Sequence, residues 1–109
     1  MQPPPERQSA TMATIATEYE LRLFVQNALL GEISNNLRAV LIAATNSKVI
    51  VDFYYDGEIS EDDWESARYV TTEIVANFDR VVGIDTNIHR LDEPIPIPQH
   101  GYCVYMRKE

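Results

Sequence analysis

The chain has 109 residues, of which 9 are Lys or Arg and 17 are Asp or Glu, so its formal net charge is −8. A chain of this length with 45% apolar residues can build one modest core, which excludes a multidomain enzyme. Its acidity repels phosphate backbones and anionic lipid surfaces, and its basic residues are scattered except at Arg107 and Lys108. We therefore expect no direct binding to nucleic acid and no contact with a membrane.

The cysteine content and the hydropathy pattern bear on where the protein acts. The single cysteine, Cys103, cannot form a disulfide within the chain, which suits a reducing compartment. The longest apolar run, residues 39–44, is too short to cross a bilayer, and the first residues lack the apolar segment of a signal peptide. We expect a cytoplasmic protein. One Cys and two His cannot build a four-ligand structural zinc site without carboxylates, and the isolated glycines form no phosphate-binding loop, so neither a metal nor a cofactor is expected.

The first elements in chain order are a leader and a helix. Residues 1–17 are rich in Pro, Ser, Thr and Ala and offer little periodic apolar surface, which predicts a disordered leader before a single domain over residues 18–109. An amphipathic helix is predicted to begin at Thr17 or Glu18 and to end near Gly31. Its apolar residues repeat at threes and fours, at Leu21, Phe24, Val25, Ala28 and Leu29.

Two strands and a second helix are expected next. Residues 37–44 and 48–55 are apolar or β-branched and are separated by a polar turn, which predicts a β-hairpin that ends at Asp56 and Gly57. Ser60 and Asp63 then have the spacing of a capping box, with acids in the first turn. The apolar face that follows predicts a helix to about Asn77.

The last part of the chain predicts two further strands. Residues 82–88 alternate apolar and polar, as in a strand with one buried face. Alternate prolines in residues 93–98 remove backbone donors and predict an extended connection, and a last strand is predicted over residues 102–107. The order α-β-β-α-β-β favours an α+β fold in which two helices cover one face of a mostly antiparallel four-stranded sheet, although the second helix could also cross between the second and third strands. The other face would stay partly in contact with water, and the edge strands would be open to a partner.

Seven acids lie within residues 52–65, where there is no Lys or Arg: Asp52, Asp56, Glu58, Glu61, Asp62, Asp63 and Glu65. A calcium-binding loop aligned on Gly57 would place Tyr54 and Asp63 at two ligand positions where they fit poorly, and a strand precedes it where a helix is required. In the structural interpretation, Asp56 forms a turn, Asp63 caps a helix and the rest are solvated. In the functional one, the cluster binds a basic partner, because uncompensated like charges cost stability.

Aromatic side chains lie within and beside this acidic segment, as in surfaces that anchor a protein partner. Phe53 and Trp64 are predicted to belong to the core. The candidate anchors are Tyr54, Tyr55 and Tyr69.

A catalytic site is not predicted. His89 lies on the same strand face as Asp85 and Asn87, and a lone His is more often a surface group than a catalyst. His100 and Cys103 are three residues apart in an extended segment, which points their side chains to opposite faces. We expect a protein that is not an enzyme.

Several sequence blocks resemble one family of small bacterial proteins over residues 18–109. The most specific are residues 56–60, Asp-Gly-Glu-Ile-Ser, within the block 53–61, and residues 90–92, Arg-Leu-Asp; others are residues 19–22, 28–31, 36–40, 93–96 and 105–109. Members of this family look like immunity proteins of polymorphic toxin systems, particularly contact-dependent growth inhibition. The resemblance implies that the partner is the C-terminal domain of a cognate toxin, typically a nuclease.

This resemblance agrees with the charge, since a nuclease needs a basic cleft that an acidic inhibitor can occupy. The expected toxin-binding residues are Asp56, Glu58, Glu61, Asp62 and Glu65, with Tyr54, Tyr55 or Tyr69 filling pockets on the toxin. The alternative is a regulatory or structural protein that binds another basic partner, or itself, through the same surface.

Overall fold

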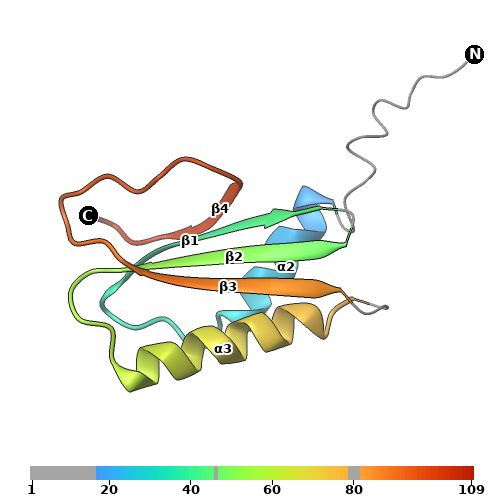
Figure 1. The fold of residues 1–109 in the computed structure, drawn as a ribbon, viewed down its shortest axis with the longest axis horizontal. Helices are drawn as coiled ribbons and strands as arrows, with labels where there is room; N and C mark the ends of the chain where they lie inside the picture. Colours follow the sequence, from blue (N-terminus) through green and yellow to red (C-terminus); the bar gives the residue numbers. More distant parts are fainter. Residues whose placement is uncertain (1–16, 46, 79–81) are drawn as a thin grey trace, which may run out of the picture.

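The computed structural model describes residues 17–45, 47–78 and 82–109, and its elements follow the predicted order (Figure 1). They are α2 (Glu18–Ala28), β1 (Leu37–Ala44), β2 (Lys48–Tyr55), α3 (Glu61–Val75), β3 (Gly83–Arg90) and β4 (Tyr102–Met106). The predicted leader, residues 1–17, lies outside the described residues except for Thr17, which caps α2.

Both helices begin at a capping box. The Thr17 hydroxyl accepts a hydrogen bond from the Glu20 amide at 3.1 Å, and the Glu20 carboxylate accepts one from the Thr17 amide at 2.9 Å. Ser60 and Asp63 repeat this arrangement at the start of α3, at 3.0 and 3.1 Å. The predicted capping box is confirmed. Each pair satisfies two amides that a helix start otherwise leaves without a partner.

The four strands form one sheet in the order β3-β2-β1-β4. The β1–β2 hairpin is antiparallel, as predicted, and β4 is antiparallel to β1. However, β3 runs parallel to β2, from Lys48 opposite Gly83 to Tyr55 opposite Arg90. The prediction of a mostly antiparallel sheet is therefore wrong, and the sheet is mixed. The reason is α3, which returns the chain to the end of the sheet where β2 begins and so acts as a parallel crossover.

The main core lies between the helices and one face of the sheet, so both helices cover the same face, as predicted. Its side chains alternate along the strands, because successive residues point to opposite faces. They include Leu21, Val25, Ala28, Val40, Ile42, Val49, Val51, Phe53, Ala67, Val70 and Ile74.

The opposite face is partly covered by the connection between β3 and β4, residues 91–101, which we call the strap. Because β3 and β4 are the two edge strands, the strap crosses from one edge of the sheet to the other (Figure 1). Its Leu91 and Ile97 pack against Ala39, Leu41 and Tyr54. The predicted extended connection is only partly right, because residues 93–95 form a turn in which the Ile95 amide donates to the carbonyl oxygen of Asp92 at 2.9 Å. The strap shields one end of the face that was expected to stay partly in contact with water.

Candidate functional site

The seven acids of residues 52–65 fall into two groups, of which the first comprises Asp52, Asp56 and Asp63. The Asp52 carboxylate lies 2.8 Å from Nε2 of His89. Asp56 pairs with Arg107 at 3.1 Å, a contact between positions far apart in the sequence. The lack of a basic residue within residues 52–65 therefore does not leave these acids without partners.

Asp63 is 5% exposed and links α3 to the loop before β1. Its carboxylate accepts hydrogen bonds from Ser34 at 3.1 Å, Asn36 at 2.9 Å and the Ser60 amide at 3.1 Å. Burial opposes ionisation, but the hydrogen bonds from Asn36, Ser60 and Ser34 outweigh it and lower the pKa of Asp63. Asp63 is thus a structural carboxylate.

The second group is exposed: Glu58 in the turn before α3, and Glu61, Asp62 and Glu65 in its first two turns. Within the part of the chain that the structure describes, none of these four carboxylates forms an ion pair. The positive end of the helix dipole favours acids at this position, which helps the fold to tolerate the clustered charge.

Tyr69 adds an aromatic side chain to these acids. It is 50% exposed and follows Glu61 and Glu65 at successive spacings of four residues on α3. Residues four apart in a helix are neighbours on its surface. We call Glu58, Glu61, Asp62, Glu65 and Tyr69 the acidic surface.

The other aromatic candidates are engaged within the fold. Tyr55 is 2% exposed, its hydroxyl lies 3.4 Å from the carbonyl oxygen of Asp63, and burial raises its pKa. Tyr54 is buried beneath the strap, where its ring stacks on His89 at 4.6 Å and its hydroxyl lies 3.2 Å from Nε2 of His100. Neither ring is free to enter a pocket on a partner.

Trp64 was predicted to be a core residue but is 41% exposed, and this prediction is wrong. It stands on the flank of α3, beside the buried stripe that holds Ala67 and Val70. The spacing of apolar residues alone does not distinguish a position on the flank of the helix from one in the core. The polar residues around Trp64 in the first two turns were the sequence feature that pointed to its exposure.

Arg107 forms a network of ion pairs at the end of the sheet where α3 begins. Arg107 contacts Asp56, Glu109 at 3.2 Å and the carbonyl oxygen of Asn35 at 2.8 Å. Glu93 of the strap lies 3.8 Å from the same guanidinium. This network fixes the turn that carries Glu58.

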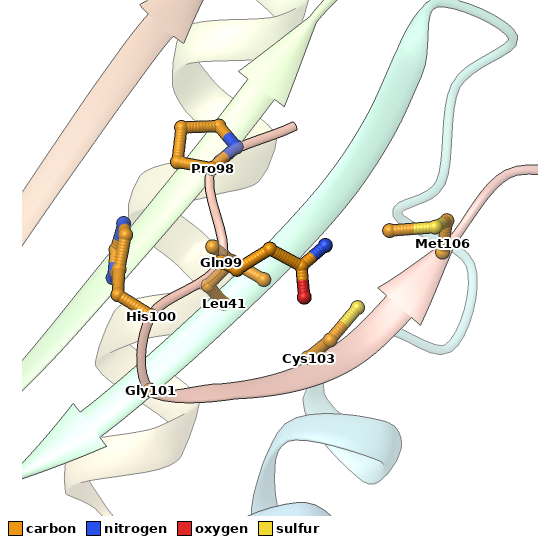
Figure 2. Close-up of a pocket in the computed structure, with 7 residues that line it drawn as sticks. All are labelled: Leu41, Pro98, Gln99, His100, Gly101, Cys103 and Met106. Carbon is orange, nitrogen blue, oxygen red and sulfur yellow. The ribbon is translucent and has the colours of Figure 1, made fainter. Parts of the chain in front are cut away.

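The pocket in Figure 2 lies on the strap side of the sheet and has a volume of about 360 Å³. Its lining includes His100, Cys103 and Met106. The imidazole of His100 points away from the Cys103 thiol, as the extended spacing predicted (Figure 2). His100 is instead held by Tyr54, so the two side chains form no nucleophile and base pair.

The calcium-loop alternative fails on geometry. Its first and fifth candidate ligands, Asp52 and Asp56, are bonded to His89 and Arg107, while Asp63 caps α3. In the described ranges, no group of three His, Cys, Asp or Glu side chains could hold a metal ion. No helix among these residues is long and apolar enough to cross a membrane.

A search among curated proteins finds no match. Residues 18–109 match the family described as MafI2 immunity protein, and this match spans the whole described domain apart from Thr17. Immunity proteins bind and neutralise a cognate toxin, in agreement with the resemblance seen in the sequence. The chain therefore belongs to the MafI2 immunity protein family.

Proposed function

We propose that this protein neutralises a basic nuclease domain of its cognate toxin by binding it through the acidic surface. The observation that carries the proposal is the division of the acids. Three of the seven are engaged within the fold, whereas Glu58, Glu61, Asp62 and Glu65 are exposed and form no ion pair with another described residue. Asp56, Tyr54 and Tyr55, which the sequence placed among the binding residues, are engaged internally, so the proposal does not use them.

The mechanism is stoichiometric binding. A nuclease holds its substrate backbone with Lys and Arg, and carboxylates at the start of α3 would pair with these groups in place of phosphates. Opposite net charges also accelerate the encounter of inhibitor and toxin. Tyr69 would provide the rigid aromatic contact, since such side chains dominate the binding energy of protein interfaces.

The proposed site of action in the cell follows from the nucleic acid that the toxin would cleave. A nuclease toxin is harmful where the nucleic acid of the cell lies, so the proposed site of action is the cytoplasm. Delivery of the toxin by contact-dependent growth inhibition is part of the same proposal and rests on the family resemblance. Catalysis by the immunity protein is not required, because occupation of the toxin cleft is sufficient.

The experiment uses the toxin domain encoded beside the gene for this protein. Growth is measured with both proteins produced together, and the association rate is measured at several salt concentrations. Glu61→Lys combined with Glu65→Lys should slow association about tenfold or more at low salt and reduce its salt dependence. Continued killing despite folded wild-type protein would contradict the proposed function.

Glu18→Lys is the matched control for the Glu61→Lys change made alone. Glu18 and Glu61 are both the first residue of a helix, directly after the N-cap residue, so both reversals meet the same unfavourable helix dipole. Glu18 lies on α2, outside the acidic surface, where it pairs with Arg22 at 2.8 Å. Glu18→Lys should leave association nearly unchanged. Equal slowing by Glu18→Lys and Glu61→Lys would show that only net charge matters.

A further inference from the structure

The outer edge of β3 carries backbone groups without a partner strand in the described part of the chain. The amides of Gly83 and Leu91 donate to carbonyl oxygens of Ser47 and Tyr55 in or beside β2, at 2.9 and 2.8 Å. Because N–H and C=O of one residue point to the same side of a strand, odd-numbered residues face β2 and even-numbered ones face outward. The outward set is Ile84, Thr86, Ile88 and Arg90.

The other edge of the sheet is protected. Strand β4 has five residues and its pairing with β1 is interrupted by a register shift between Val40 and Leu41. Arg22 of α2 also donates to the carbonyl oxygen of Cys103 at 3.0 Å. Short length, bulges and covering side chains are features that commonly keep an edge strand from pairing with another chain. Strand β3 has eight residues, no proline and an unbroken register with β2 in the described part of the chain, so it is neither short nor bulged.

The charges along β3 are compensated, unlike those on α3. Asp85 pairs with Lys48 at 3.0 Å, and the ring of His89 lies 2.8 Å from Asp52. Arg90 lies 3.1 Å from a carboxylate of the strap. A chain with a net charge of −8 thus presents one edge with little net charge. Two copies of this acidic chain repel each other least where their contact surface carries little charge, as at this edge. The acidic surface, by contrast, suits a basic partner.

We propose that β3 pairs with β3 of a second copy of this chain, antiparallel and across a twofold axis at Asn87. In this register, each of the four outward-facing residues lies opposite an outward-facing residue of the second copy. Asp85 then lies opposite the partner's His89. Thr86 lies opposite the partner's Ile88. No like charges stand directly opposite one another, which is the condition for stable cross-strand pairs.

The pairing keeps the exposed carboxylates at the two helix starts apart. Helix α3 begins at the end of the sheet where β3 ends, so antiparallel strands place the two helix starts at opposite ends (Figure 1). An eight-residue strand spans about 26 Å at roughly 3.3 Å per residue, beyond a Debye length of about 8 Å. The carboxylates at the helix starts therefore lie away from the twofold axis, and the test of dimerisation needs no toxin.

The experiment measures the mass of the full chain by light scattering and sedimentation over a range of concentrations. The wild type should show a dimer that dissociates on dilution. Asn87→Lys places two ammonium groups at the twofold axis, and Asn87→Asp places two carboxylates there, so each variant alone should be monomeric. An equimolar mixture of the two should restore a dimer containing one chain of each. Circular dichroism checks that both variants fold.

Gln26→Lys on the exposed side of α2 is the control, because it makes the same charge change as Asn87→Lys away from β3 and should leave the dimer intact. Three results would overturn the proposal. One is a wild type that stays monomeric at all concentrations, and another is a dimer that persists in Asn87→Lys. The third is protection of β3 amides from hydrogen exchange only when the toxin domain is added, which would make the toxin the occupant of this edge.

Discussion

Arg38 and Glu109 lie 71 positions apart and form a two-pronged ion pair, with Nε to Oε2 at 2.7 Å and Nη2 to Oε1 at 2.9 Å. The remaining nitrogen of Arg38, Nη1, donates to the carbonyl oxygens of Leu91 and Ile95 at 2.7 and 2.8 Å. The hydrogen bonds with Glu109 raise the pKa of Arg38. One buried guanidinium on β1 thus holds both the strap and the segment after β4.

Arg38→Ala should destabilise the protein by about 2–4 kcal/mol, because it removes the donor to the carbonyl oxygens of Leu91 and Ile95 and leaves Glu109 paired with Arg107 alone. Urea unfolding measures the change. Arg90→Ala is the control, since Arg90 pairs with Asp92 while both side chains are largely exposed. Its cost should be at most about 1 kcal/mol. Equal costs for the two variants would contradict a central role for Arg38.

Asp63→Asn should make stability less dependent on pH. Because hydrogen bonds lower the folded-state pKa of Asp63, its ionised form stabilises the protein above an unfolded pKa of about 3.9. That contribution is lost as the pH falls through the folded value. The free energy difference between wild type and Asp63→Asn should therefore be largest near neutral pH and shrink below about pH 4.

Asp62→Asn is the control for this pH experiment. It removes the same charge from the same helical turn, at an exposed side chain outside the capping box. Its stability difference from the wild type should change little between neutral and acid pH. A curve like that of Asp63→Asn would show that total charge, and not the bonded carboxylate, sets the pH dependence.

Gly101→Ala should be more destabilising than Gly31→Ala. Both glycines have positive φ, at 63° and 81°, which costs an alanine on the order of 1 kcal/mol. A Cβ on Gly101 would also lie 2.6 Å from the carbonyl oxygen of Ile42, whereas one on Gly31 would meet nothing within 4 Å. Thermal or urea unfolding should show an additional loss of about 1–3 kcal/mol for Gly101→Ala. Similar losses would mean that the strap shifts to accept the methyl group.

Tyr69→Ala should weaken toxin binding about tenfold, since truncation of an interface tyrosine typically costs more than 1 kcal/mol. Calorimetric titration with the toxin domain measures it. Tyr19→Ala removes an even more exposed ring, 71% against 50%, from α2 and should leave affinity unchanged. A loss of affinity with Tyr19→Ala alone would move the binding face from α3 to α2.

Local patterns predicted the elements well because their causes are local. The apolar spacing of Leu21, Val25 and Ala28 requires a helix, and the Ser60 and Asp63 capping box requires a start at that position. The direction of β3 had no local cause. An antiparallel return and a parallel crossover by α3 bury the same alternating residues, so the pattern of Ile84, Thr86 and Ile88 fits either.

The candidate site was predicted less completely, because its charges are set by distant partners. Arg107 lies 51 positions from Asp56, and His89 lies 37 from Asp52, so inspection of residues 52–65 alone could not show that these acids are paired. Tyr55 likewise lies in the core because alternate residues of β2 face the helices. Which alternate set faces the helices depends on the register of the strand and not on residue type. What remained at the surface was the part of the acidic segment on α3.

The first turn of α3 contains both residues that stabilise the fold and residues that are exposed to solvent. Ser60 and Asp63 satisfy the helix start and fasten it to Asn36, while Glu61 and Asp62 point into solvent. Substitutions at the two exposed positions change the charge pattern of the surface and remove no buried side chain. If toxin binding uses the acidic surface as proposed, the inhibitor can follow the divergence of its toxin by changing single solvent-facing residues, and its scaffold does not have to change with them.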